Sequence, residues 1–461
     1  MKIIDTIDCF IPGDWGNETL SEEAPCKVSC IRGADIVPIE NNDFSHIPTR
    51  YISQQSFDTK CFQAGDIIVE KSGGSPTQST GRVSYVSQEL IDSVGSVVCS
   101  NFCVAFRVKQ NWNPLYIYYY LQHVYNNGVF FNFEGKTSGI KNLQLEAAYN
   151  AVPIEDVNKT TQDSIVAVLD SIQKKMTINR QINQNLEALA KQLYDYWFVQ
   201  FDFPDEEGKP YKSSGGAMMY SNILRRNIPL NWEVEELGNT CEILLGGTPD
   251  TGNELYWGGS YSWLNSGEVA EFPILKSEKT ITEEGLNSSA TAYAPKGSVT
   301  LSITRHLRPS ILAIDACINQ SVVAIKETEN LRKEYLYPLI NREIPRYMTL
   351  RTGAQQPHIN KETVESTWII IPPTGILDKY YMTVSSIYRS IIENAIEIEN
   401  LTKQRDELLP LLMNGQVSLN SDLAVNAFID IITFLTLSNE SKSRRIGISP
   451  KRIWRIGLSV L

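Results

Sequence analysis

From Thr161 to Phe198 the chain reads TQDSIVAVLDSIQKKMTINRQINQNLEALAKQLYDYWF. Ten positions in this stretch recur at alternating spacings of four and three residues, the heptad pattern of a coiled-coil seam. These positions are Ile165, Leu169, Ile172, Met176, Asn179, Asn183, Leu186, Ala190, Leu193 and Trp197. The pattern predicts one continuous helix of roughly 33 residues, or about 50 Å.

The same spacing returns 215 residues later, near the end of the chain. The repeated positions are Tyr380, Val384, Ile387, Ile391, Asn394, Ile398, Leu401, Arg405, Leu408 and Leu412. Two seams in one register indicate a tandem duplication, and two such helices within one chain would satisfy each other most simply as an antiparallel pair. The resulting pseudo-two-fold axis would point the two globular halves in opposite directions. The alternative is an ordinary amphipathic helix packed on a globular core.

Asparagines Asn179, Asn183 and Asn394 interrupt the otherwise mostly apolar seams. A buried asparagine in a seam costs stability, but it penalises slipped registers because only the correct register lets the amides pair. The seam residues expected to hold the two helices together are Ile172, Met176, Asn179, Asn183, Leu186, Ile387, Ile391, Asn394, Ile398 and Leu401.

Outside the helices, short strand-like runs such as Asp66 to Val69 alternate with turns, so we predict an α+β fold with two globular domains. The predicted parts are residues 1–155 (first globular domain), 156–200 (first long helix), 201–227 (connector), 228–373 (second globular domain), 374–416 (second long helix) and 417–461 (a tail outside the repeat). The tail is interpreted as an extension of the folded chain, with a helix that docks on a partner as the alternative.

The two globular halves match each other only in pieces. Gly65-Asp66 corresponds to Gly297-Ser298, and Trp15-Gly16 is matched with Trp257-Gly258. The offset between the halves falls from about 240 to 215 along the chain and then stays constant in the helices. The globular domains have therefore diverged while the helices kept their register.

Composition limits the class of protein. A net charge of −11 argues against a tight nucleic-acid binder that acts alone, but not against one that shares its grip with a partner. The eight cysteines show neither a CxxC pair nor zinc-ligand spacing, and we interpret them as reduced, mostly buried thiols of a cytoplasmic protein. The apolar run from Leu423 to Leu437 is too short to span a membrane.

Motifs for catalysis are missing from the sequence. Gly73-Gly74-Ser75-Pro76 and Gly246-Gly247-Thr248-Pro249 are turns that lack the lysine of a phosphate-binding loop. No methyltransferase tetrapeptide occurs, the four histidines have no metal-ligand spacing, and no pair of nucleophile and base can be assigned. We therefore expect no catalytic residue and no metal site in this chain.

Basic, polar loops offer a better candidate for a binding site. Between Lys296 and Lys361 ten Lys or Arg residues face five Asp or Glu residues, an island of positive charge in an acidic chain. Guanidinium and amide groups are the side chains that grip phosphates and read base edges. The predicted DNA-binding residues are Lys71, Arg82, Lys136 and Lys141 in the first domain, and Arg305, Arg308, Arg346, Arg351, Gln355, Gln356, His358 and Lys361 in the second. For any one of them a solvated charged surface is the alternative.

Several stretches together resemble the DNA-specificity subunit of type I restriction–modification systems. They include Leu244-Leu245-Gly246-Gly247-Thr248-Pro249, Trp263-Leu264-Asn265-Ser266-Gly267-Glu268, Tyr196-Trp197-Phe198-Val199-Gln200-Phe201-Asp202 and Leu408-Leu409-Pro410-Leu411-Leu412-Met413-Asn414-Gly415. With the duplication, the resemblance covers roughly residues 1–417; the tail departs from it.

The resemblance implies two target recognition domains, each reading one half of an interrupted site in double-stranded DNA. The paired helices would set the distance between the halves and dock two modification (methyltransferase) subunits. It also implies that the cofactors, S-adenosylmethionine, ATP and Mg²⁺, belong to partner modification and restriction/translocase subunits, and that this chain binds none and contacts no membrane. The other hypotheses are a coiled-coil scaffold that binds a protein or glycan, and a self-contained restriction–methylation enzyme.

Overall fold

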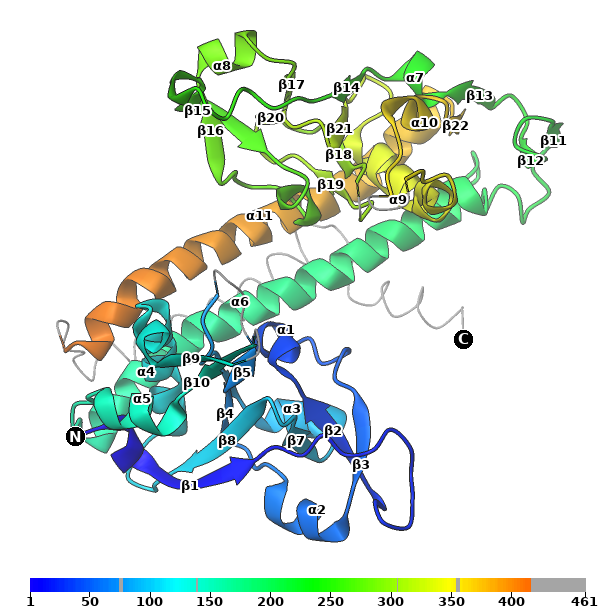
Figure 1. Cartoon of the computed structure of the whole chain (residues 1–461). Helices are drawn as coiled ribbons and strands as arrows, with labels where there is room; N and C mark the ends of the chain where they lie inside the picture. Colours follow the sequence, from blue (N-terminus) through cyan, green and yellow to red (C-terminus); the bar gives the residue numbers. More distant parts are fainter. Residues whose placement is uncertain (74–77, 138–139, 305, 354–356, 416–461) are drawn as a thin grey trace. The chain divides into compact units, whose positions relative to one another are not determined.

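The computed structural model describes residues 1–73, 78–137, 140–304, 306–353 and 357–415, without the side chains of residues 136 and 137 (Figure 1). The predicted tail, including Leu423 to Leu437, lies outside the described residues. The chain forms two compact units. Unit 1 joins Met1–Ile178 to the described residues from Asn400 onward, and unit 2 is Asn179–Glu399.

Unit 1 is built mainly from short strands. Its strands are β1 (Ile7–Pro12), β2 (Cys26–Ile31), β3 (Thr49–Ile52), β4 (Ile67–Glu70), β5 (Ser72–Gly73), β6 (Val83–Tyr85), β7 (Val97–Cys99), β8 (Cys103–Val108), β9 (Glu134–Thr137) and β10 (Ile140–Leu143). Its shorter helices are η1 (Ile3–Thr6), η2 (Gly33–Asp35), α1 (Ile36–Glu40), α2 (Gln54–Lys60), α3 (Gln88–Val94), α4 (Pro114–Asn126), η3 (Val129–Phe133) and α5 (Leu145–Ala151). The strands form sheets with the orders β1-β8-β4-β6, β3-β2-β7 and β5-β10-β9.

Unit 2 has the same α+β character. Its strands are β11 (Met218–Ser221), β12 (Arg226–Pro229), β13 (Glu233–Glu236), β14 (Ile243–Leu245), β15 (Trp257–Leu264), β16 (Lys279–Ile281), β17 (Ala292–Ala294), β18 (Val299–Ser302), β19 (Pro309–Ile311), β20 (Ala316–Ile318), β21 (Val322–Ile325) and β22 (Trp368–Ile371). Its shorter helices are η4 (Asp195–Val199), α7 (Leu237–Thr240), η5 (Glu254–Tyr256), η6 (Glu268–Ala270), α8 (Glu283–Asn287), α9 (Lys333–Thr349) and α10 (Lys361–Glu365). The larger sheets have the orders β14-β21-β18-β19 and β16-β15-β20-β17.

The two units repeat one strand order, which confirms the predicted internal duplication. The sheet β1-β8-β4-β6 of unit 1 corresponds to β14-β21-β18-β19 of unit 2. In both sheets the spatial order is the first strand along the chain, then the last, the second and the third. Each second sheet contains one parallel pair, β2 with β7 and β15 with β20. Gly65-Asp66 and Gly297-Ser298 precede the equivalent strands β4 and β18, and both glycines have positive φ angles, 100° and 94°.

The central strands of the second sheets match position by position. The parallel pairs align Ile31 with Leu264, because these residues oppose Cys99 and Ile318, respectively. The ladder of β15 with β16 is irregular between Trp257 and Tyr261, so this alignment does not extend to Trp257. The match of Trp15-Gly16 with Trp257-Gly258 stays a prediction.

Two long helices carry the heptad seams. Helix α6 spans Lys159–Tyr194 and α11 spans Thr374–Met413. In unit 2, Asn183 of α6 contacts Ile391 of α11, and Asn179 contacts Glu397 further along it. Residue numbers therefore run in opposite directions along the two helices in unit 2. The antiparallel pairing predicted from the seams is confirmed.

Unit 1 contains the other ends of the same two helices. Met176 of α6 meets Thr402 of α11, and Gln173 meets Arg405, so the antiparallel pairing holds there as well. Leu409, Leu412 and Met413 of α11 are buried in the core of unit 1. The long helices are thus part of the hydrophobic cores.

The seam asparagines pair as a register device requires. The Asn394 side chain donates to Asn183 Oδ1 at 2.8 Å, and the Asn183 amide donates to the backbone oxygen of Ile391 at 3.0 Å. Asn394 and Asn183 are only 3% and 8% exposed. Asn179 instead donates to the Glu397 carboxylate.

Replacing Asn394 with leucine should lower the free energy of unfolding by about 1–3 kcal/mol, because it removes the donor to the buried Asn183 oxygen. The double variant Asn183→Leu/Asn394→Leu should recover part of that loss, because apolar groups then face each other. Urea unfolding of the single and double variants gives the coupling energy. Additive effects of the two substitutions would contradict the pairing.

Strand residues alternate between two cores, because successive side chains of a strand point to opposite faces of the sheet. Ile67 and Val69 of β4 face a core completed by α4, α5 and the long helices, whereas Ile68 between them faces the second sheet. In unit 2 Val323 and Val322 of β21 divide in the same way. The sheets β1-β8-β4-β6 and β14-β21-β18-β19 are therefore each buried on both faces.

Two predicted loops contain regular structure. Residues 135–141, expected to be a small basic loop, contribute to strands β9 and β10, which pair Lys141 with Lys136. Residues 201–227, expected to be a connector, contain β11 and the first residues of β12, which pair Tyr220 with Asn227. Both segments contain Gly and charged residues, and composition alone does not separate paired short strands from an irregular loop.

Candidate nucleic-acid interface

Two segments of the basic island of unit 2 are joined through their backbones. Isolated β-bridges join His358 to Thr304 and to Thr352. The backbone NH of Ile359 donates to the oxygen of Ile303 at 3.0 Å. The turn between β18 and β19 and the loop after α9, about fifty residues apart in sequence, therefore lie side by side.

Unit 1 has the same arrangement at the equivalent place. Strand β5 follows β4 and pairs with β10, opposing Asn142 to Ser72, and β10 also pairs with β9. The backbone NH of Leu143 donates to the oxygen of Lys71 at 2.8 Å. The predicted DNA-binding segments are thus brought together in each unit, although they are distant in sequence.

Arg82 and Arg308 occupy equivalent positions. Val69 opposes Val83 in unit 1, and Leu301 opposes Pro309 in unit 2, so the preceding residues Arg82 and Arg308 correspond. Their backbone oxygens accept from Glu70 N at 2.9 Å and from Ser302 N at 3.2 Å, respectively. The repeat therefore places a carboxylate opposite the arginine in unit 1 and a hydroxyl in unit 2.

This difference decides what each guanidinium can do. Arg82 donates to both Glu70 oxygens, at 2.8 and 2.7 Å, and to the backbone oxygen of Gly33 at 2.9 Å. The hydrogen bonds to Glu70 raise the pKa of Arg82, and the Glu70 side chain is only 4% exposed. Arg308 is exposed and has no ion-pair partner among the described residues. Arg82 is therefore engaged in the fold, whereas Arg308 is available to a ligand.

The remaining predicted residues of unit 1 differ in their availability. Lys141 pairs with Glu134 at 3.2 Å, donates to the Gln78 oxygen at 3.1 Å, and lies 5.1 Å from the centre of the Phe131 ring. Lys71 is exposed beside the β5–β10 pairing. The side chain of Lys136 lies outside what the structure describes.

In unit 2, several predicted residues have partners in their own helix. Arg346 pairs with Glu343 and donates to Thr367 Oγ1 at 2.9 Å, and Lys361 pairs with Glu365 at 3.0 Å. Arg351 donates to the backbone oxygen of Met348. His358 is exposed on the bridge between the two loops. Arg305, Gln355 and Gln356 lie outside the described residues.

Charge counting in the sequence missed the acidic partners of these basic residues. Glu70 and Glu134 neutralise Arg82 and Lys141 from neighbouring strands. It also missed Thr304, whose bridge to His358 joins the two loops. The pairing of Glu70 with Arg82 could have been suspected from the sequence, because Glu70 comes directly after a predicted strand and Arg82 follows the next predicted turn.

Other features bear on the class of protein. All eight cysteines are free thiols, and five of them are buried. Across the described ranges, no three His, Cys, Asp or Glu side chains gather in a way that could hold a metal ion. None of the described helices has the length and apolar character needed to cross a bilayer.

The fold defines a tandem-repeat protein with two α+β domains and two antiparallel long helices, and each domain presents a pair of basic loops. This chain belongs to the family described as the type I restriction modification DNA specificity domain, which matches residues 35–188 and 229–403. Both halves of the duplication are covered by the match.

Individual relatives agree with this family. The MjaIX type I restriction enzyme specificity subunit of Methanocaldococcus jannaschii is 23% identical over 261 residues, 56% of this chain and 58% of the relative. The HindI specificity subunit of Haemophilus influenzae is 22% identical over 312 residues, 56% of this chain and 68% of the relative. A crystal structure of a type I S subunit from M. genitalium shares the fold, with a TM-score of 0.51 and 13% identity over 90% of this chain and 95% of that one.

Proposed function

We propose that this chain is the non-catalytic DNA-specificity subunit of a type I restriction–modification system, which reads a two-part, interrupted site in double-stranded DNA. The observation that carries the proposal is the repetition of one loop arrangement in two domains of a chain of this family. Two similar but diverged domains suit two half-sites of different sequence, because each presents its own side chains at equivalent positions.

The loops have the chemistry for DNA recognition. Arg308 presents an exposed guanidinium, and His358 an exposed imidazole, on adjoining backbone segments of unit 2. Lys71 is exposed at the corresponding place in unit 1. Guanidinium groups bind guanine bidentately and also pair with phosphates, whereas an ammonium group grips phosphates as a point charge.

The proposal assigns catalysis to partners. Two modification subunits would carry S-adenosylmethionine, and restriction subunits would carry ATP and Mg²⁺, in a cytoplasmic complex on DNA. The relatives named as specificity subunits of restriction enzymes support this division of labour. The seam residues predicted to dock the modification subunits also hold α6 and α11 together, so docking would use the outer faces of the same helices.

The proposal is tested by mapping methylated bases in a host without other methyltransferases, after expressing this chain with its modification subunit. We expect one motif of two short specified halves separated by a gap of unspecified bases, and no methylation when either protein is expressed alone. A continuous motif, or methylation by this chain alone, would overturn the proposal.

Replacing Arg308 with alanine should weaken DNA binding by about 10–100-fold, the ~1–3 kcal/mol expected for a base-reading arginine, and should relax the half-site read by unit 2. Fluorescence anisotropy with the mapped site measures the loss. Lys379→Ala, an exposed cation on α11 away from the loops, is the matched control. If Arg308 contacts only phosphate, affinity falls for all sequences and the salt dependence flattens. Unchanged affinity and salt dependence would remove Arg308 from the interface.

A further inference from the structure

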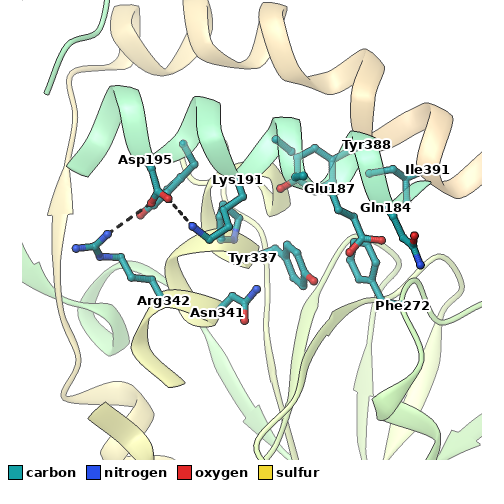
Figure 2. A pocket seen from close by; sticks show the side chains of 14 residues that line it. Gln184, Glu187, Lys191, Asp195, Phe272, Tyr337, Asn341, Arg342, Tyr388 and Ile391 are labelled. Carbon is teal, nitrogen blue, oxygen red and sulfur yellow. Dashed lines mark hydrogen bonds and ion pairs between the residues drawn. The ribbon is translucent and has the colours of Figure 1, made fainter. Parts of the chain in front are cut away.

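Unit 2 contains a cavity of about 420 Å³ between α6, α9 and α11. Figure 2 shows two ends: an ion-paired group around Asp195, and a second end where Glu187 and Gln184 of α6 lie near Phe272. The Phe272 and Tyr337 rings stack with their centres 4.5 Å apart and 17° between their planes. Part of the cavity lining is therefore an aromatic pair.

Hydrogen-bonding groups in this cavity are left unused. Within the described part of the chain, the side chains of Glu187, Gln184 and Asn341 have no hydrogen-bond or ion-pair partner. Burial raises the pKa of the Glu187 carboxyl to about 7. Burying a charged carboxylate without a partner costs free energy. A cation that fits the cavity would offset this cost by pairing with Glu187.

The cations already present do not serve Glu187. Asp195 pairs with Lys191 at 2.6 Å and with Arg342 at 3.5 Å, which occupies both of them (Figure 2). An anionic ligand would therefore have to displace Asp195, whereas a cationic ligand would find a free carboxylate. The polarity of the cavity favours a cation.

The internal repeat identifies which cation. The 215-residue register matches Ala190, which lines the cavity, to Arg405 of α11 in unit 1. Arg405 donates to the neighbouring Asp406 carboxylate at 3.0 and 2.9 Å, and its guanidinium also reaches Glu40 Oε1 at 3.3 Å and Gln173 Oε1 at 3.4 Å. The same register matches Gln173 to Tyr388, another residue that lines the cavity. Unit 1 thus carries its own guanidinium where unit 2 has an alanine and a cavity.

The neighbouring helices support this correspondence. Helix α4 begins at Pro114 and helix α9 at Lys333. When these first residues are aligned, Tyr118 corresponds to Tyr337, and Gln122 corresponds to Asn341. In unit 1 Gln122 donates to the Tyr118 hydroxyl at 2.7 Å and to Glu40 at 3.4 Å, so its amide lies beside a carboxylate that Arg405 also contacts. Asn341 lines the cavity of unit 2 at the equivalent place.

We propose that the cavity between α6, α9 and α11 is a binding site for a guanidinium group supplied from outside the chain. The planar group would lie against the Phe272–Tyr337 pair and donate two parallel hydrogen bonds to the Glu187 carboxylate. Gln184 and Asn341 provide further acceptors. The guanidinium can come from a small guanidino compound or from an arginine side chain of a bound protein.

Isothermal titration of the full chain with agmatine tests the site, and 1,4-diaminobutane serves as the ammonium comparison. Agmatine should bind, Glu187→Gln should weaken its binding at least tenfold, and the exposed control Asp378→Asn should leave it unchanged. Ala190→Arg, which supplies the guanidinium from within as unit 1 does, should abolish agmatine binding in a folded protein. Leu189→Arg, an exposed neighbour that does not line the cavity, is its control.

A second arm distinguishes the two sources and depends on the proposed function. If a protein supplies the arginine, agmatine should compete with the modification subunit, and Glu187→Gln should weaken that complex. If the source is a small compound, agmatine should bind the assembled complex as well as the free chain. The inference is overturned if wild-type protein binds no agmatine and the complex is indifferent to Glu187→Gln, or if diaminobutane binds as tightly as agmatine.

Discussion

Replacing Arg82 with alanine is expected to lower the free energy of unfolding by about 3–5 kcal/mol, because the buried Glu70 carboxylate loses both of its hydrogen bonds from the guanidinium. The same variant also loses the hydrogen bond to Gly33, which ties β6 to the segment after β2. The effect should concentrate in unit 1. Hydrogen exchange of peptides from residues 67–85, followed in increasing urea, measures it.

Arg308→Ala is the matched control, because the same residue at the equivalent position of unit 2 faces Ser302 and not a carboxylate. It should change the free energy of unfolding by less than about 0.5 kcal/mol, the usual range for an exposed side chain. Arg82→Ala should thus lower stability, whereas Arg308→Ala should leave stability almost unchanged and weaken DNA binding. An Arg82→Ala protein that is as stable as wild type but fails to bind DNA would contradict this assignment.

Glu187→Gln is expected to stabilise the protein at pH 8 by about 1–3 kcal/mol, less than the whole pKa shift would give, because the side chain is only half-buried and water screens its charge. Burial raises the folded-state pKa of Glu187 to about 7 from its usual 4.5, so the folded protein resists losing this proton. Below pH 4.5 the carboxyl is protonated in both states and costs nothing. Between pH 4.5 and 7 stability falls as the pH rises, and above pH 7 the full cost is present, ~1.4 kcal/mol for each pKa unit.

The groups that face Glu187 do not cancel this cost. Lys191 and Arg342 are paired with Asp195, while Tyr337 of α9 and Tyr388 of α11 are phenols whose pKa burial raises, so both stay neutral. The stability difference between Glu187→Gln and wild type should therefore shrink by more than half between pH 8 and pH 5. Thermal unfolding at both pH values checks this, with Asp378→Asn as the control. A difference that does not depend on pH would mean that Glu187 is solvated.

The helices were the most predictable part of the fold. A heptad pattern is local and uninterrupted, so it determines both the existence of α6 and α11 and which of their faces is buried. The pairing of Asn183 with Asn394 was also predictable, because an amide in an apolar seam requires another polar group nearby. The sheets were less predictable. Strand β2 pairs with β7, which lies more than sixty residues away in sequence. Neither strand contains a sequence feature that identifies its partner.

The candidate site was predicted in outline only. The loops around Arg308 and His358 were singled out by their charge, and the fold does bring them together. Which basic residues are free could not be predicted, because that depends on strand register. The turn between β4 and β6 sets Arg82 against Glu70, twelve residues away, and no count of charges distinguishes such a pair from an open cation. The cavity beside Glu187 could not be predicted either. It exists because Ala190 is small at the position where unit 1 has Arg405.

The division of unit 1 between distant parts of the chain has a consequence for its biosynthesis. Leu169 on α6 is covered in a core that includes Leu409 and Leu412, yet the ribosome makes Leu409 240 residues after Leu169. At ~5–20 residues per second, this delay is on the order of 12 to 50 seconds. During that time the nascent chain carries an uncovered apolar stripe. The newly made protein therefore has a period in which chaperones, or a second nascent copy, compete with α11 for this apolar surface.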